Sequence, residues 1–370
     1  MSNHYDVCLI SYSNVFTDAR TLNLANTLSI SMSVLVIALS SNLESTNLHN
    51  FELIEIELNK DFSGWKNWIN FSHKAKSINI TSNYFVACDL YSLVPASYQA
   101  VGSNSQLIYD SREIYSKLGP LSNKPLKQFI ISQIEKFYIQ NVSKVIVSGE
   151  LDAEYLRKYF KQSIEYIVIK NLPPFSIHKI TNRLRNEFKI PSDKLILIYQ
   201  GAILDGRGII PTLKAIKDNN NYHFVIIGDG NFKQKLIEFV NSNNLFEKVT
   251  FVGEVPYSEL ISFTSSADIG ICLFEPISKS YELSLPNKLF EYMMAGIPCI
   301  ATNLPAINEL LSKNKIGVLI NDVNDVEEII DNLEKLENTV FRNELSENAK
   351  KLRVNYSYES QENLILSIFN

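Results

Sequence analysis

Basic charge and long apolar segments are both scarce in this sequence. Its 35 lysines and arginines are outnumbered by 40 acidic residues, which gives a formal net charge of −5. A nucleic-acid-binding protein would instead concentrate basic residues on one face. No segment contains the roughly 18 consecutive apolar residues that a membrane-spanning helix requires. We therefore expect neither a nucleic-acid partner nor a membrane-spanning segment.

Potential metal ligands are also few and poorly spaced. The cysteines lie in separate apolar runs without a CxxC spacing, as expected of reduced, buried thiols in the cytoplasm. The histidines form neither an HxxxH pair nor a histidine–carboxylate pattern, and no DxD triplet is present. We expect no metal site and no cofactor. The residues concerned are Cys8, Cys88, Cys272, Cys299, His4, His49, His73, His178 and His223.

The first residues, MSNHYDVCLISYS, have neither the basic region nor the apolar length of a signal peptide. We therefore expect a cytoplasmic protein. Whether it touches a membrane depends on the segment PLKQFIISQIEKFYIQ at 125–140, which is basic and amphipathic. A helix packed on a sheet is the favoured interpretation of this segment. Peripheral membrane contact is the alternative.

Short β-branched runs alternate with helical patterns along most of the chain. The first series has strands at YDVCLISYS, MSVLVIALS, YFVACD, QLIYDS and KVIVSG, and the second, after a polar stretch at 182–194, at KLILIYQGAI, HFVIIGDG, KVTFVGEV, ADIGICLF, PCIATN and IGVLIN. Runs that are apolar on both faces indicate parallel sheets covered by helices. We predict an α/β protein with two Rossmann-like, doubly wound domains. They comprise residues 1–178, with a helix at 356–370 packing back on them, and residues 179–355.

The segment SLPNKLFEYMMAGIPCIATN at 284–303 predicts a well-bounded helix over residues 286–295. Proline is favoured in a first helical turn, and Gly296 followed by proline is a common way to end a helix. Lys288 and Glu291 share one helix face, opposite an apolar face. A helix N-terminus with a nearby lysine suits a phosphate group. The alternative is a solvated lysine–glutamate pair.

This segment closely resembles the signature of the retaining glycosyltransferases with the GT-B fold, in the family-four group (glycosyltransferase group 1). The resemblance covers nearly the whole chain and is dense in the second half. It implies two domains that face a central cleft, with Glu291 on the donor ribose and Lys288 on the pyrophosphate. In YQGAILDGRGIIPTLKAI, Arg207 stands where the family has a basic residue that binds the diphosphate. The implied donor-binding set is Gly201, Arg207, Gly228, Val255, Leu285, Pro286, Asn287, Lys288 and Glu291.

Two segments of the first half, SNVFTDARTLNLANTLS and LIYDSREIY, resemble the acceptor-side loops of the family. They supply Asn14, Asp18, Arg20, Asp110, Arg112 and Glu113. Arg112 stands where relatives commonly have a histidine that contacts the transferred sugar. It either forms a surface salt bridge with Asp110 or Glu113, or binds an anionic group of a substrate. The first glutamate of the family pattern is also displaced, since Leu283 stands at its place beside Glu282.

The resemblance implies a glycosyltransferase that moves a sugar from a nucleotide diphosphate sugar to a glycan or lipid-linked acceptor, with retention. Bacterial surface polysaccharide or lipopolysaccharide synthesis is the implied pathway. Two cations and a helix N-terminus would stabilise the leaving diphosphate without a metal. The expected catalytic residues are Arg207, Lys288, Glu291 and Arg112. The alternatives are a sugar-nucleotide 2-epimerase and an inactive nucleotide-binding paralogue; a dehydrogenase is disfavoured because SYSNVFTDAR lacks GxGxxG.

Overall fold

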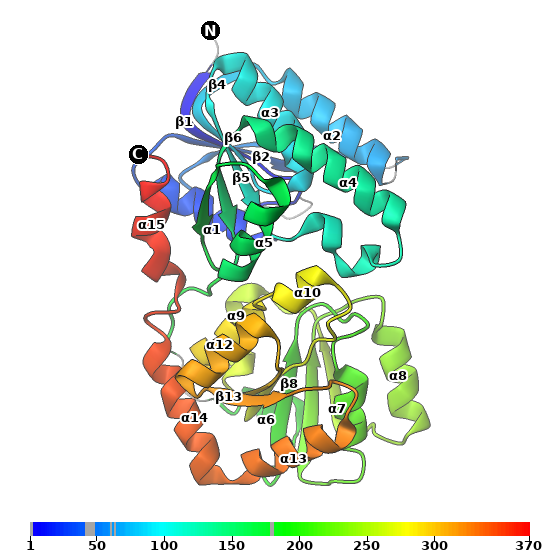
Figure 1. Ribbon diagram of the computed structural model, residues 1–370. Helices are drawn as coiled ribbons and strands as arrows, with labels where there is room; N and C mark the ends of the chain where they lie inside the picture. The colour runs from blue at the N-terminus through cyan, green and yellow to red at the C-terminus, as the bar shows by residue number, and fades with distance from the viewer. Residues whose placement is uncertain (1–2, 41–48, 60, 63, 178–180) are drawn as a thin grey trace. The chain divides into compact units, whose positions relative to one another are not determined.

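The computed structural model describes residues 3–40, 49–59, 61–62, 64–177 and 181–370. The chain forms two compact units, the first from Met1–Asn171 with Gln361–Asn370 and the second from Leu172–Ser360 (Figure 1). The predicted boundary, between residues 178 and 179, lies outside the described residues. The polar stretch at 182–194 belongs to the second unit, where Arg185 pairs with Asp268 at 3.1 Å.

The first unit contains a parallel sheet with the strand order β3-β2-β1-β4-β5-β6-β7. Its central strands are buried on both faces, as their continuous apolar runs predict. The strands are β1 (Asn3–Ile10), β2 (Val34–Leu39), β3 (Glu52–Ile56), β4 (Ile80–Ala87), β5 (Gln106–Ser111), β6 (Val142–Val147) and β7 (Glu165–Val168). The helices are α1 (Ala19–Leu28), α2 (Trp65–Ser77), α3 (Leu90–Ser103), α4 (Pro125–Tyr138), α5 (Glu150–Phe160) and α15 (Glu362–Ser367).

The C-terminal residues Gln361–Asn370 belong to the first unit, whereas the predicted returning segment spans 356–370. The Gln361 side chain accepts a hydrogen bond from the Lys170 N–H at 2.7 Å and donates one to its carbonyl at 3.0 Å. The Lys144 ammonium donates to the Ile368 carbonyl at 2.6 Å. These bonds attach the last helix, α15, to the first unit.

The second unit contains a parallel sheet with the order β10-β9-β8-β11-β12-β13. The strands are β8 (Leu195–Gln200), β9 (Tyr222–Ile227), β10 (Val249–Gly253), β11 (Ile269–Cys272), β12 (Cys299–Thr302) and β13 (Gly317–Ile320). The helices are α6 (Arg183–Phe188), α7 (Ile209–Ala215), α8 (Lys233–Ser242), α9 (Tyr257–Thr264), α10 (Lys279–Leu283), α11 (Asn287–Ala295), α12 (Pro305–Asn314), α13 (Val326–Glu337) and α14 (Thr339–Leu352). Two doubly wound units are thus confirmed.

The described residues include no helix long and apolar enough to cross a bilayer. All four cysteines are free and buried, as predicted. The segment at 125–140 forms α4, in which Glu135 is the one fully buried residue. Ile131 and Tyr138 pack against the core of the first unit, as the favoured interpretation expects, whereas Leu126, Phe129, Ile130 and Phe137 are exposed.

Candidate functional site

Two glycines bring the ends of β8 and β9 into contact. Gly201 and Gly228 follow these strands with φ values of +115° and +126°, which residues other than glycine rarely adopt. A Cβ on Gly228 would lie only 2.1 Å from the Gly201 carbonyl oxygen. The two predicted donor-binding glycines therefore lie side by side at the carboxyl edge of the sheet, where α/β proteins bind ligands.

Helix α11 matches the predicted helix closely. Pro286 precedes its first residue, and Gly296 ends it with φ +77°, donating its N–H to the carbonyls of Met293 and Tyr292. The Tyr292 hydroxyl donates hydrogen bonds to two strand carbonyls, that of Ile198 at 3.1 Å and that of Ile271 at 3.0 Å. This buried phenol fixes α11 against β8 and β11.

Lys288, in the first turn of α11, is a buried cation. The residue is only 8% exposed. Its ammonium lies 3.7 Å from the ring centroid of Tyr199 and 5.3 Å from that of Phe274. Among the described residues it has no carboxylate partner and no hydrogen bond. Burial, together with the nearby Arg207, lowers its pKa to about 8. The alternative of a solvated pair with Glu291 is therefore wrong.

Arg207 also contacts the Phe274 ring. Its guanidinium carbon is 4.2 Å from the Phe274 ring centroid and 4.4 Å from that of Tyr281, and Nη2 donates to the Tyr281 hydroxyl at 2.9 Å. Its Nε is buried and has no hydrogen-bond partner in the part of the chain that the structure describes. Two repelling cations held by π faces instead of carboxylates form a site that an anion would stabilise.

Glu291 is held in place by a short relay of hydrogen bonds. Its carboxylate accepts from the Gln200 amide, and the Gln200 oxygen accepts from the Thr264 hydroxyl at 2.8 Å. Burial raises the pKa of Glu291, while Gln200 and Lys288 oppose this shift. The carboxylate can therefore present its remaining lone pairs in a fixed direction.

Several residues that shape this site were not among the predicted ones. Tyr199 and Gln200 immediately precede Gly201, and Phe274 follows β11. In the sequence, their positions at the carboxyl ends of β8 and β11 were the feature that could have marked them as site residues. Their aromatic and amide contacts with α11 could not be inferred from spacing.

The remaining predicted donor residues are less directly placed. Val255 and Leu285 are partly buried against the core of the second unit. Asn287 is exposed at the start of α11. Glu282 forms a surface ion pair with Lys279 at 2.7 Å, and the two side chains are 42% and 38% exposed, respectively. Glu282 therefore pairs with a residue outside the site.

Four of the predicted acceptor-side residues form one ion-pair network in the first unit. The Arg20 guanidinium donates to both oxygens of Asp110, with Nε···O distances of 3.1 and 2.9 Å. Arg112 contacts Asp18 at 2.6 Å through Nη1 and Asp110 at 3.2 Å through Nε. Its Nη2 donates to the Thr21 hydroxyl at 2.6 Å. The network connects the start of α1 to the end of β5.

These contacts favour a structural role for Arg112. Three of its nitrogens donate within the protein, and the side chain is 18% exposed, so it forms a largely buried cluster rather than a surface pair. Burial disfavours the charged form of Asp18, but Arg112 and neighbouring hydroxyls outweigh it and lower the pKa of that carboxyl. Of the other two predicted residues, the Asn14 side chain accepts from the Phe16 N–H, and Glu113 is exposed.

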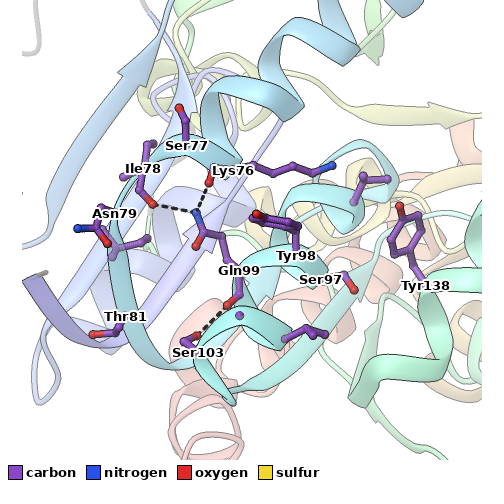
Figure 2. Close-up of a pocket in the computed structure, with 14 residues that line it drawn as sticks. Lys76, Ser77, Ile78, Asn79, Thr81, Ser97, Tyr98, Gln99, Ser103 and Tyr138 are labelled. Carbon is purple, nitrogen blue, oxygen red and sulfur yellow. Dashed lines mark hydrogen bonds between the residues drawn. The ribbon is translucent and has the colours of Figure 1, made fainter.

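No group of three potential ligands that could hold a metal is found among the described residues, and His178 lies outside them. A pocket of about 620 Å³ does occur in the first unit, between α2, α3 and the start of β4. Figure 2 shows Gln99 within it, donating to the carbonyls of Lys76 and Ile78 that end α2. This pocket lies at the amino end of β4, so it is separate from the predicted acceptor-side residues at the ends of β1 and β5.

Comparison with known proteins identifies the second unit. The family described as glycosyl transferases group 1 matches residues 181–352. Residues 181–352 belong to this family. A group 1 glycosyltransferase domain thus carries Gly201, Gly228, Arg207, Lys288 and Glu291. The predicted glycosyltransferase group 1 is confirmed for these residues.

Curated relatives include two glycosyltransferases of surface-polysaccharide synthesis. The O-antigen biosynthesis glycosyltransferase WclY of Escherichia coli is 28% identical over 129 residues, which cover 35% of this chain and 34% of WclY. The lipopolysaccharide core biosynthesis glycosyltransferase LpsD of Rhizobium meliloti is 22% identical over 210 residues, 54% of this chain and 57% of LpsD. An uncharacterised glycosyltransferase of Methanocaldococcus jannaschii is 30% identical over 164 residues, 44% of each chain. The matches thus span about a third to somewhat over half of these relatives.

Solved structures show the same fold over the whole chain. Sucrose-phosphate synthase from Thermosynechococcus elongatus has a TM-score of 0.82 at 15% identity and covers 98% of both chains. The Anabaena protein HepE, solved with UDP-glucose, has a TM-score of 0.77 at 13% identity and covers 99% of both chains. The GT-B fold is therefore confirmed. The predicted cleft between its two units stays a prediction.

Proposed function

We propose that this protein transfers a sugar from a nucleoside diphosphate sugar to a glycan or lipid-linked acceptor in bacterial surface polysaccharide or lipopolysaccharide synthesis. One observation carries the proposal. Lys288 and Arg207 contact the same Phe274 ring, and neither has a carboxylate partner among the described residues. A buried cation such as Lys288, with a second cation nearby, is costly unless an anion joins it. A diphosphate supplies that anion.

The neighbouring groups fit the rest of such a donor. Gly201 and Gly228 have no side chains, so a phosphate can approach the backbone at the ends of β8 and β9. The N-terminus of α11 directs free N–H groups and a positive dipole end toward the same place. In this proposal the Glu291 carboxylate accepts from the ribose hydroxyls, and Val255 lies near the base.

The chemistry needs stabilisation of a leaving group above all. As the bond between C1 of the sugar and the diphosphate oxygen breaks, negative charge grows on that oxygen, and Lys288 and Arg207 stabilise it. The departing phosphate accepts the proton of the acceptor hydroxyl, whose oxygen bonds to C1 on the same face, so that configuration is retained. No metal ion takes part in this scheme.

The place of action belongs to the same proposal. Lipid-linked acceptors of surface polysaccharides lie at a membrane, and two curated relatives are named for O-antigen and lipopolysaccharide core synthesis. We place the protein in the cytoplasm, in peripheral contact with the inner face of the membrane.

Ligand-dependent stability tests the donor site. A ligand that binds only the folded protein raises the melting temperature. We expect at least one nucleoside diphosphate to raise it for the parent protein and for Lys313→Gln, which alters an exposed lysine, but not for Lys288→Gln. If no nucleoside diphosphate stabilises the folded parent protein, or Lys288→Gln responds equally, the proposed donor site is wrong.

A further inference from the structure

Helices α2, α3 and α4 form a layer on one side of the first sheet (Figure 1). Large apolar side chains of this layer are exposed to solvent. On α4, the exposed fraction is 71% for Leu126, 61% for Phe129, 49% for Ile130 and 66% for Phe137. These four follow a spacing of three, four and seven residues and so lie along one stripe of the helix. Monomeric proteins rarely expose such a stripe without a use for it.

The neighbouring helices extend the apolar surface. Trp65 and Ile69 on α2, with Tyr98 and Val101 on α3, are exposed by 66%, 41%, 60% and 65%. Tryptophan and tyrosine are favoured at the boundary between water and lipid, because each has an apolar body with a polar end. We define the α2–α4 surface by these four residues and the four of α4.

The charge of this layer has one sign. Helices α2, α3 and α4 contain five lysines and a single carboxylate. That carboxylate, Glu135, is 1% exposed and accepts a hydrogen bond from the Tyr109 hydroxyl at 2.9 Å, so it adds no charge to the surface. The asymmetry stands out in a chain whose formal net charge is −5. The lysines are Lys66, Lys74, Lys76, Lys127 and Lys136.

We propose that the α2–α4 surface docks onto a bilayer that contains anionic lipids. Aromatic and aliphatic side chains enter the interface, while the lysines bind headgroups, which is the arrangement of peripheral membrane-binding surfaces. The pocket in Figure 2 is a recess of this surface, with Lys76 and the exposed Tyr98 in its lining, their ammonium and ring centroid 5.5 Å apart. A protein partner of matching charge would need acidic residues around an apolar centre, whereas a lipid surface supplies both features over the whole area.

The inference deepens the membrane location given under the proposed function. Its test uses no nucleotide sugar, so that its failure leaves the transferase proposal standing. Vesicles of phosphatidylcholine with phosphatidylglycerol, and vesicles of phosphatidylcholine alone, are sedimented with the full chain. We expect binding to the anionic vesicles only, and weaker binding as salt is raised.

Paired variants assign the binding to this surface. Phe129→Ser with Phe137→Ser, and separately Lys66→Gln with Lys127→Gln, should each lower the vesicle partition coefficient about tenfold or more. The matched controls are Phe246→Ser with Val340→Ser, exposed by 62% and 79% on the second unit, and Lys313→Gln with Lys351→Gln. Neither control should change binding, and all variants should keep the parent melting temperature.

Three outcomes would overturn the inference. They are a failure of the parent protein to bind anionic vesicles, equal binding to both vesicle types, and equal losses in the control variants. Self-association is measured by light scattering. A dimer that Phe129→Ser with Phe137→Ser converts to a monomer, in a protein that ignores vesicles, would show that this surface binds a second copy instead.

Discussion

Burial lowers the pKa of Lys288 from its ordinary value of 10.5 to about 8. A bound diphosphate favours the charged ammonium and therefore raises this pKa, so binding takes up a proton when the free lysine is neutral. We expect the affinity for a nucleoside diphosphate to fall between pH 7.5 and 9.5, and titration calorimetry at the two pH values measures it. In Lys288→Met the dependence should disappear. A dependence of equal size in Lys288→Met would assign it to another group.

The same shift affects stability with a defined sign. Because the folded-state pKa is depressed, the unfolded chain binds more protons between pH 8 and 10.5, and the folded state gains stability as pH rises through that range. Without ligand, the free energy of unfolding of the parent should therefore rise relative to that of Lys288→Met. Urea unfolding across this range checks the sign.

Glu291 offers a second prediction at the scale of one residue. Glu291→Ala removes the acceptor proposed for the ribose, and loss of a hydrogen bond to a charged group costs about 1.5–3 kcal/mol. We expect roughly 10- to 100-fold weaker nucleotide binding in calorimetry, with the fold retained. Glu282→Ala, which alters a surface glutamate paired with Lys279, is the control and should bind like the parent. Unchanged affinity in Glu291→Ala would refute the ribose assignment.

At the scale of elements, the contact of the β8 and β9 loops depends on glycine. Gly228→Ala places a methyl group against the Gly201 carbonyl at a φ of +126°, so the loops must move apart. We expect a loss of stability above about 1 kcal/mol, together with weaker nucleotide binding. Gly102→Ala is the control, because nothing lies within 4 Å of its new methyl group. Melting curves compare the two, and equal stability would contradict the described contact.

The ion-pair network joins α1 to β5 and predicts a structural effect for Arg112. Arg112→Ala leaves Asp18 and Asp110, which are largely buried, with less compensating charge, and breaking such a pair costs about 3–5 kcal/mol. We expect a clearly lower urea midpoint. The control Lys158→Ala removes a surface ion pair with Glu154, in which the side chains are 75% and 59% exposed, and should leave the midpoint unchanged. Full stability with lost transfer activity would instead support a substrate-binding role.

Whole-molecule features were the most predictable from the sequence. Strands such as β8 and β9 are continuous apolar runs, and α11 is bounded by proline and glycine, so local signals sufficed. Strand β3 was not predicted, because Glu52–Ile56 is a short, half-exposed edge strand with two glutamates. The partners of Arg112 and the rings around Lys288 come from segments far apart in the chain. Such contacts depend on tertiary packing, which spacing does not record.

The central claim is that Lys288 and Arg207 stabilise a leaving diphosphate without a metal. The most direct measurement is the release of nucleoside diphosphate from a panel of nucleotide sugars, by the whole chain, with excess chelator. The account predicts slow release from at least one donor that chelator leaves unchanged, and loss of that release in Lys288→Met at nearly unchanged melting temperature. Release that stops on chelation and returns with magnesium or manganese would contradict the account, as would equal release by Lys288→Met.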